Sequence, residues 1–167
     1  DFELIVVNDG SDSEFTVPKW VRLIDKNNEE RIIAYNTGFK KAKGELFMCL
    51  DADMAFSTKD FLKKMVKPFI EDKRIAGNFV CFKPNPKQPS LTRCVSYDPF
   101  QRDPIYKILT IGPEKIIKKK MDGWYLCECN EKNIPPQGCM LYRKKLAKDY
   151  SDTHIQLTDN EIPAHLI

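Results

Sequence analysis

The sequence predicts an α/β domain with a mainly parallel central sheet, and three segments lead to this prediction. Residues 2–7 form an apolar, β-branched segment, residues 34–44 indicate a short helix, and residues 46–50 form a second apolar segment. Strands that are apolar without alternation are buried on both faces, as in parallel sheets whose connections are helices. The order strand, helix, strand therefore predicts a Rossmann-like domain of three layers, with helices on both sides of the sheet.

Both predicted strands end in carboxylates. Residues 2–7 lead into Asn8-Asp9-Gly10-Ser11, and residues 46–50 lead into Asp51-Ala52-Asp53. Ligands of open α/β sheets bind at the carboxyl ends of the strands, so we expect these acids to line a binding site. Residues two apart leave an extended chain on the same side. Because Mg²⁺ and Mn²⁺ prefer carboxylate and phosphate oxygens, the Asp-x-Asp pair is suited to hold a metal–diphosphate.

These segments together resemble the family 2 glycosyltransferases of the GT-A fold. Three motifs carry the resemblance, in this order: the strand that ends in Asn8-Asp9-Gly10-Ser11, the helical segment with Ala34, Asn36, Gly38, Ala42 and Gly44-Glu45, and Leu50-Asp51-Ala52-Asp53. The resemblance is clear over residues 2–70 and weaker afterwards. It implies a GT-A-like fold and an inverting enzyme. Such an enzyme moves a sugar from a nucleotide-sugar donor to the hydroxyl of a carbohydrate or lipid-linked acceptor.

The resemblance also implies roles for individual carboxylates. Asp9 would receive the base of the nucleotide, Asp51 its ribose, and Asp53 would face the Mn²⁺ or Mg²⁺ ion. Residues 157–166 are similar to the family's segment with the general base, which falls on Asp159. Without the resemblance, Asp159 would be interpreted as the cap of a helix that begins at Asn160.

Length and composition are consistent with a single domain. The 167 residues are enough for a single core, and we predict one domain over 1–167, with a nucleotide-sugar-binding half at 1–82 and an acceptor half at 83–167. The net charge of +3 gives no reason to expect a nucleic-acid partner, and the run Lys118-Lys119-Lys120 is interpreted as a solvated helix face. No apolar stretch has the length of a transmembrane segment. We therefore expect a cytoplasmic protein, with the membrane surface as an alternative location.

The six cysteines do not predict a metal centre. Cys49 and Cys81 lie in apolar runs and are interpreted as small core residues, and the thiols are expected to be reduced. Cys127, Cys129 and Cys139 lack the Cys-x-x-Cys spacing and an evident fourth ligand, so zinc is not favoured.

The remaining periodicity predicts further elements. We expect strands at 20–24, 75–82 and 124–127, a strand after the Gly138 turn, and helices at 58–73 and 114–121. The helix at 58–73 has an apolar stripe of Phe61, Leu62, Met65, Val66, Phe69 and Ile70, which predicts its buried face. Pro68 is expected to kink it.

Departures from the family pattern leave two alternatives open. Family members normally begin with a further strand that is missing here, and Tyr35 stands where an arginine is usual, so we expect a piece that begins inside the domain. One alternative is a sugar nucleotidyltransferase, which should show a glycine-rich basic loop after its first strand. The other is a degenerate, non-catalytic glycosyltransferase-like domain that binds a carbohydrate or a partner without turnover.

Overall fold

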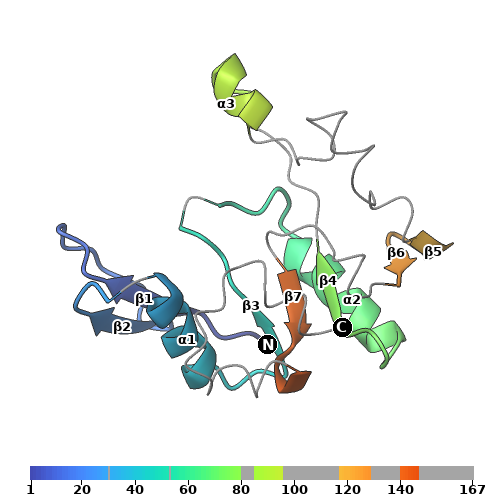
Figure 1. Ribbon diagram of the computed structural model, residues 1–167, viewed down its shortest axis with the longest axis horizontal. Coiled ribbons are helices and arrows are strands. Elements are labelled where there is room, and N and C mark those ends of the chain that lie inside the picture. Colours follow the sequence, from blue (N-terminus) through green and yellow to red (C-terminus); the bar gives the residue numbers. More distant parts are fainter. Residues whose placement is uncertain (30, 53, 80–84, 96–116, 129–139, 147–167) are drawn as a thin grey trace.

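A computed structural model covers residues 1–167 and describes residues 1–29, 31–52, 54–79, 85–95, 117–128 and 140–146. Its elements, in chain order, are β1 (Ile5–Asp9), β2 (Arg22–Lys26), α1 (Arg31–Lys41), β3 (Leu46–Met48), α2 (Phe61–Glu71), β4 (Gly77–Phe79), α3 (Ser90–Val95), β5 (Ile117–Lys120), β6 (Tyr125–Cys127), β7 (Met140–Arg143) and a final 3₁₀ turn, η1 (Lys144–Leu146) (Figure 1).

The strands form three small sheets, so the prediction of a mainly parallel central sheet is wrong for the described part of the chain. Strands β1 and β2 pair in parallel, whereas the sheet β3-β7-β4 and the pair β5-β6 are antiparallel. The reason is the position of β7. It is the last of the described strands, lies between β3 and β4, and runs opposite to both of them (Figure 1). The α/β class is confirmed.

Helices α1 and α2 pack on opposite faces of the β3-β7-β4 sheet. Tyr142 of β7 is buried with Phe39 of α1, whereas its neighbour Leu141 is buried with Met65 and Phe69 of α2. Successive side chains of a strand point to opposite faces, so a four-residue strand supplies both cores. Strand β7 belongs to the predicted acceptor half and completes a sheet of the predicted donor half. The division at residue 82 stays a prediction.

An aromatic cluster fills the α1 side of this sheet. The Phe47 ring lies 5.6 Å from Tyr35, 5.0 Å from Phe39 and 5.7 Å from Tyr142, measured between centroids. The hydroxyls of Tyr35 and Tyr142 hydrogen-bond each other. Burial raises the pKa of the Tyr142 phenol, and the bond to Tyr35 satisfies a polar group that would otherwise be costly to bury.

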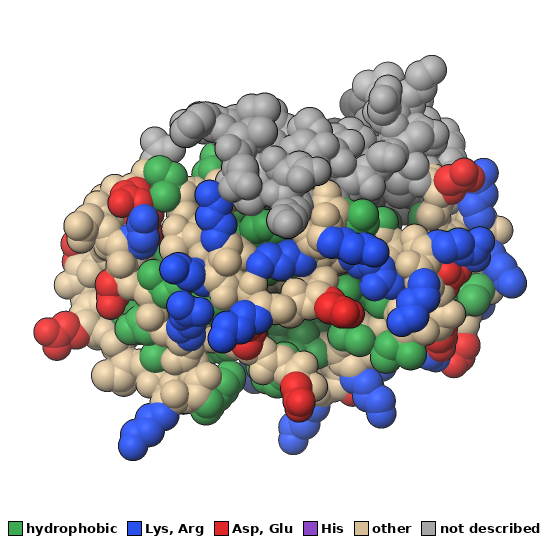
Figure 2. Space-filling view, turned by 90° about the horizontal axis from the view of Figure 1, so that it is seen from below, with side chains coloured by type: hydrophobic (Ala, Val, Ile, Leu, Met, Phe, Trp, Pro, Cys, Tyr) green, Lys and Arg blue, Asp and Glu red, His purple; other side chains and the backbone are tan. Residues whose placement is uncertain are grey.

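The connection from α1 to β3 reverses the chain within four residues, and cations gather around it. The Arg22 guanidinium donates to the Lys41 carbonyl (3.4 Å), and the Lys144 ammonium donates to the carbonyl of Ala42. Both carbonyls lie at the C-terminal end of α1, where the helix dipole favours positive charge. Lys and Arg side chains are spread over the face of the molecule that is seen from below in Figure 2.

Helix α2 occupies residues 61–71, within the predicted range, and Pro68 lies inside it. Of the predicted stripe, Met65 and Phe69 are buried, and Phe61 and Val66 are partly buried against the same core. Ile70 is an exception, because 71 % of its surface is exposed.

Two sequence interpretations are wrong at the level of local structure. The segment predicted as a helix at 114–121 contains the strand β5, because it pairs with β6 through a turn at Gly123, whose φ is +83°. Cys49, predicted as a core residue, is exposed. Cys81 lies outside the described residues.

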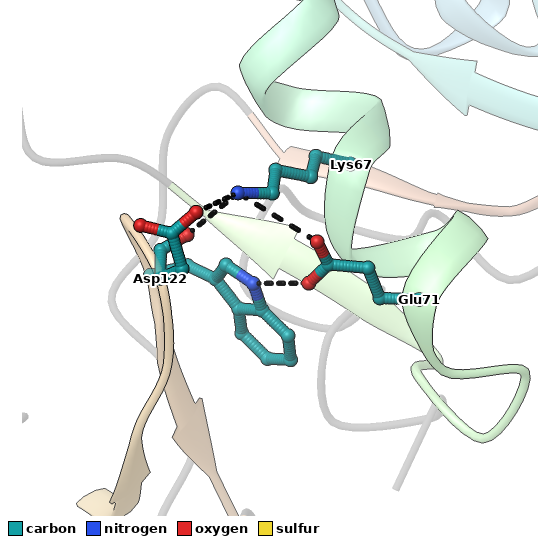
Figure 3. A network of polar contacts seen from close by, with 4 residues as sticks. Lys67, Glu71 and Asp122 are labelled. Carbon is teal, nitrogen blue, oxygen red and sulfur yellow. Dashed lines mark hydrogen bonds and ion pairs between the residues drawn. The ribbon is translucent and has the colours of Figure 1, made fainter.

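Polar contacts attach the β5-β6 hairpin to α2 (Figure 3). The Lys67 ammonium lies 2.6 Å from the Asp122 carboxylate and donates to its backbone carbonyl at 3.0 Å. The Trp124 indole N–H donates to Glu71 at 2.9 Å. The hydrogen bond from the Lys67 ammonium and its positive charge lower the pKa of Asp122. No helix in the described part of the chain is long and apolar enough to span a bilayer.

The aromatic cluster should dominate the stability of this region. Phe47→Ala removes a ring that contacts three others, and we expect it to lower the free energy of unfolding by about 3 kcal/mol in urea denaturation. The matched control is Phe2→Ala, which removes the same atoms from a side chain that is 69 % exposed and should cost less than about 1 kcal/mol. Equal losses in the two variants would contradict the assignment of the core.

Candidate active site

The turn after β1 is fixed to the loop between β2 and α1. Asp9 is the last residue of β1 and is half-buried, and its Oδ1 accepts a hydrogen bond from the backbone N–H of Glu29 at 2.9 Å. Asn8 donates from Nδ2 to Asp25 (2.9 Å) and accepts the N–H of Ser11 at Oδ1 (3.1 Å). The Asp9 carboxylate therefore has a structural role that the sequence analysis did not assign. Nucleotide binding by Asp9 stays a prediction.

Backbone geometry makes this turn specific for glycine. Gly10 has a φ of +82°, and a Cβ at Gly10 would lie 2.8 Å from the Cβ of Asn28. Asn28 itself adopts a positive φ of 54°, which asparagine tolerates better than most residues. The turn after β1 and the loop after β2 therefore contact each other through Gly10 and Asn28, both of which have a positive φ.

Asp25 and Asn28 are the residues of this region that the sequence analysis missed. The Asn27-Asn28 pair after the predicted strand is a turn signal that could have indicated the loop. Nothing in the sequence indicated that Asp25 accepts from Asn8, because that contact depends on the register in which Asn8 lies opposite Asp25.

Asp51 lies beyond the carboxyl end of β3. The strand ends at Met48, two residues before the predicted end, and Asp51 is exposed. The Met54 N–H donates to the Asp51 carbonyl at 3.1 Å. Asp53 and Asp159 lie outside the described residues, so the metal and general-base assignments stay predictions. In the described part of the chain, no three His, Cys, Asp or Glu side chains gather where they could hold a metal ion.

Strands β1 and β3 begin side by side. Glu3, just before β1, accepts hydrogen bonds from the backbone N–H groups of Lys43 and Gly44, just before β3; the bond from Gly44 measures 3.1 Å. Helix α1 follows β2 and leads into β3 through a four-residue connection. Asp9 ends β1 and Asp51 follows β3, and the chain just before each of these strands is linked by the Glu3 hydrogen bonds, although β1 and β3 are assigned to separate sheets.

The described part of the chain is an α/β structure with one carboxylate at the end of β1 and another after β3. The sequence model of Glycosyl transferase family 2 matches residues 1–151. The chain belongs to this family, which implies a GT-A fold, glycosyl transfer, and a nucleotide-sugar donor with an acceptor. No curated protein and no solved structure matches the chain.

Two glycines provide a matched test of the turn that holds Asp9. Gly10 and Gly123 have φ values of +82° and +83°, but a Cβ at Gly123 would meet nothing within 4 Å. Gly123→Ala should therefore cost only the backbone strain, about 1 kcal/mol, whereas Gly10→Ala adds a steric clash and should cost about 2–4 kcal/mol. Urea denaturation measures both losses. If Gly10→Ala is as mild as Gly123→Ala, the contact between the two loops is not as described.

Proposed function

We propose that this protein is an inverting glycosyltransferase. It transfers a sugar from a nucleotide-sugar donor to the hydroxyl of a carbohydrate or lipid-linked acceptor. The observation that carries the proposal is the family match over residues 1–151, together with the carboxylates of Asp9 at the end of β1 and Asp51 after β3. The proposal includes a GT-A-like domain of three layers and a cytoplasmic location.

Donor binding is assigned to Asp9 and Asp51. Asp9 receives the base of the nucleotide, because its carboxylate is oriented by the Glu29 N–H and is only half-buried. Asp51 receives the ribose, whose hydroxyls can donate to an exposed carboxylate.

Asp53 is assigned to a divalent cation. Carboxylates are suitable ligands for Mn²⁺ or Mg²⁺, and neither ion needs a complete cage of protein ligands when a diphosphate supplies oxygens. When bound, such a cation neutralises the negative charge that develops on the departing nucleoside diphosphate.

Asp159 is assigned as the general base. The acceptor hydroxyl oxygen attacks the anomeric carbon on the face opposite the diphosphate. The bond from that carbon to the diphosphate breaks, and the hydroxyl proton passes to the carboxylate. Because one displacement inverts the anomeric carbon, the chemistry needs no covalent intermediate and no enzyme nucleophile.

Metal binding should depend on the nucleotide. Isothermal titration with UDP, GDP and CTP, each with and without Mn²⁺, should show that Mn²⁺ binds weakly alone and much better with one nucleoside diphosphate. Asp53→Ala should abolish this cooperative binding and leave the circular dichroism spectrum unchanged.

The matched control for Asp53→Ala is Asp60→Ala, which removes an exposed carboxylate that pairs with Lys64 at 2.8 Å. Asp60→Ala should retain cooperative binding. Unchanged metal–nucleotide affinity in Asp53→Ala would contradict the metal assignment, and a preference for CTP would favour the sugar nucleotidyltransferase instead.

Asp159→Asn separates catalysis from helix capping. If Asp159 is the base, turnover should fall about 10²–10⁴-fold, the loss that is typical when a general base is removed. Donor affinity should scarcely change, because the residue serves the acceptor. Asparagine caps a helix as well as aspartate does, so a purely structural Asp159 would leave both turnover and stability intact. Steady-state kinetics and urea denaturation on the same variant distinguish the two roles, and normal turnover would make Glu161 the next candidate.

A further inference from the structure

Six cations surround the C-terminal end of α1. We call this set the α1-end cluster: Arg22, Lys40, Lys41, Lys43, Lys144 and Lys145. Hydrogen bonds link its parts, because Arg22 binds the Lys41 carbonyl and Lys144 binds the Ala42 carbonyl. The Lys144 N–H also donates to the carbonyl of Glu45 at 2.8 Å.

Capping of α1 accounts for only part of this cluster. Arg22 and Lys144 bind the last carbonyls of the helix directly, which is a structural role. The side chains of Lys40, Lys41, Lys43 and Lys145 are exposed. Among the described residues, Glu3 lies beside the cluster, and its carboxylate accepts from the backbone N–H groups of Lys43 and Gly44. The cluster therefore has more positive charge than the helix end requires.

Two large aromatic side chains lie beside the cluster. Phe2 and Trp20 are 69 % and 63 % exposed, and their rings meet edge to face with centroids 6.0 Å apart. The backbone connects them to the cluster, since the Arg22 N–H donates to the Leu4 carbonyl at 3.0 Å and Glu3 binds the loop at Lys43. Exposed aromatics of this size next to lysines are unfavourable in water but favourable at the interface of a bilayer.

We infer that the α1-end cluster and the Phe2–Trp20 pair form a docking surface for an anionic lipid bilayer. Lysines near such a surface are attracted to its phosphates and carboxylates without a specific geometry, while aromatic rings enter the headgroup region. Five of the six cations are lysines, and the single arginine donates to the Lys41 carbonyl. Nucleic-acid recognition more often uses arginine forks, so the composition favours a bilayer over RNA. This inference goes beyond the proposed transfer reaction and does not depend on it.

The test compares two triple variants that change the net charge equally. The first is Lys41→Gln, Lys43→Gln, Lys145→Gln in the cluster. The control is Lys118→Gln, Lys119→Gln, Lys120→Gln in β5, whose lysines are also exposed. Sedimentation with phosphatidylcholine vesicles, with and without phosphatidylserine, measures the partitioning of the purified protein.

The wild-type protein should bind only the vesicles that contain phosphatidylserine, and less at high salt. The cluster variant should bind these vesicles about 100-fold more weakly than the wild type, because each of the three lysines contributes a factor of about five. The control variant should bind within a few-fold of the wild type. A second variant, Trp20→Ser, should weaken binding to the vesicles about 10-fold. This loss corresponds to the lower end of the free energy that is gained when a large apolar side chain leaves water.

Three results would overturn the inference. These are no binding to phosphatidylserine vesicles at low salt, equal losses in both triple variants, and cluster-dependent binding of a single-stranded RNA oligonucleotide without binding of vesicles. Circular dichroism of each variant ensures that a loss of binding is not a loss of folding. Because only exposed side chains are changed in the triple variants, we expect both to fold.

Discussion

The arrangement of the described structure depends on the insertion of β7 between β3 and β4. Its four residues join two strands that would otherwise lack a partner among the described residues, and its alternate side chains enter two different cores. Tyr142 closes the aromatic cluster under α1, and Leu141 packs with Met65 and Phe69 of α2. Arg143 extends this link, because its guanidinium donates to the Ile75 carbonyl at 2.9 Å and lies over the Phe69 ring. A strand near the end of the described chain thus holds together elements that begin near residue 31.

The sequence predicted burial better than it predicted strand direction. Leu46, Phe47 and Met48 are apolar without alternation, and each of them packs against one of the two cores. A continuous apolar run indicates that both faces of a strand are covered, and this holds for β3. It does not specify the direction of the neighbouring strand, which here comes from a segment about ninety residues away. The prediction of a parallel sheet is wrong because burial on both faces of a strand does not determine the direction of its neighbour.

Local propensity failed where a long-range contact decides the outcome. Lysines are good helix formers, so the run Lys118-Lys119-Lys120 suggested a helix. Pairing with β6 makes this segment a strand. Ile70 fits the apolar stripe of α2 but falls beyond the edge of the core, because no described element covers that part of the helix.

The sequence motifs predicted where the carboxylates of the candidate site lie along the chain, but they did not predict the hydrogen bonds that these carboxylates make. The sequence identified Asp9 at the end of the first strand and Asp51 after the third, as the structure has them. The bond from the Glu29 N–H to Asp9 was not predictable, since it requires a loop twenty residues later to fold back onto the turn. Anchoring a loop and contacting a ligand are compatible roles for a carboxylate, which accepts several hydrogen bonds. A change at Asp9 would therefore affect the loop and the ligand together.

The starts and the ends of β1 and β3 have different charged residues beside them. Cations surround the starts of these strands, whereas Asp9 is the last residue of β1 and Asp51 follows β3. An anionic surface attracts the first end and repels the second, so the field of the protein would turn the strand ends toward the aqueous phase. Nucleotide sugars are dissolved there, which makes this orientation compatible with donor binding. It also favours an acceptor that reaches the strand ends from solution, which is simpler for a soluble carbohydrate than for a lipid held in the same bilayer.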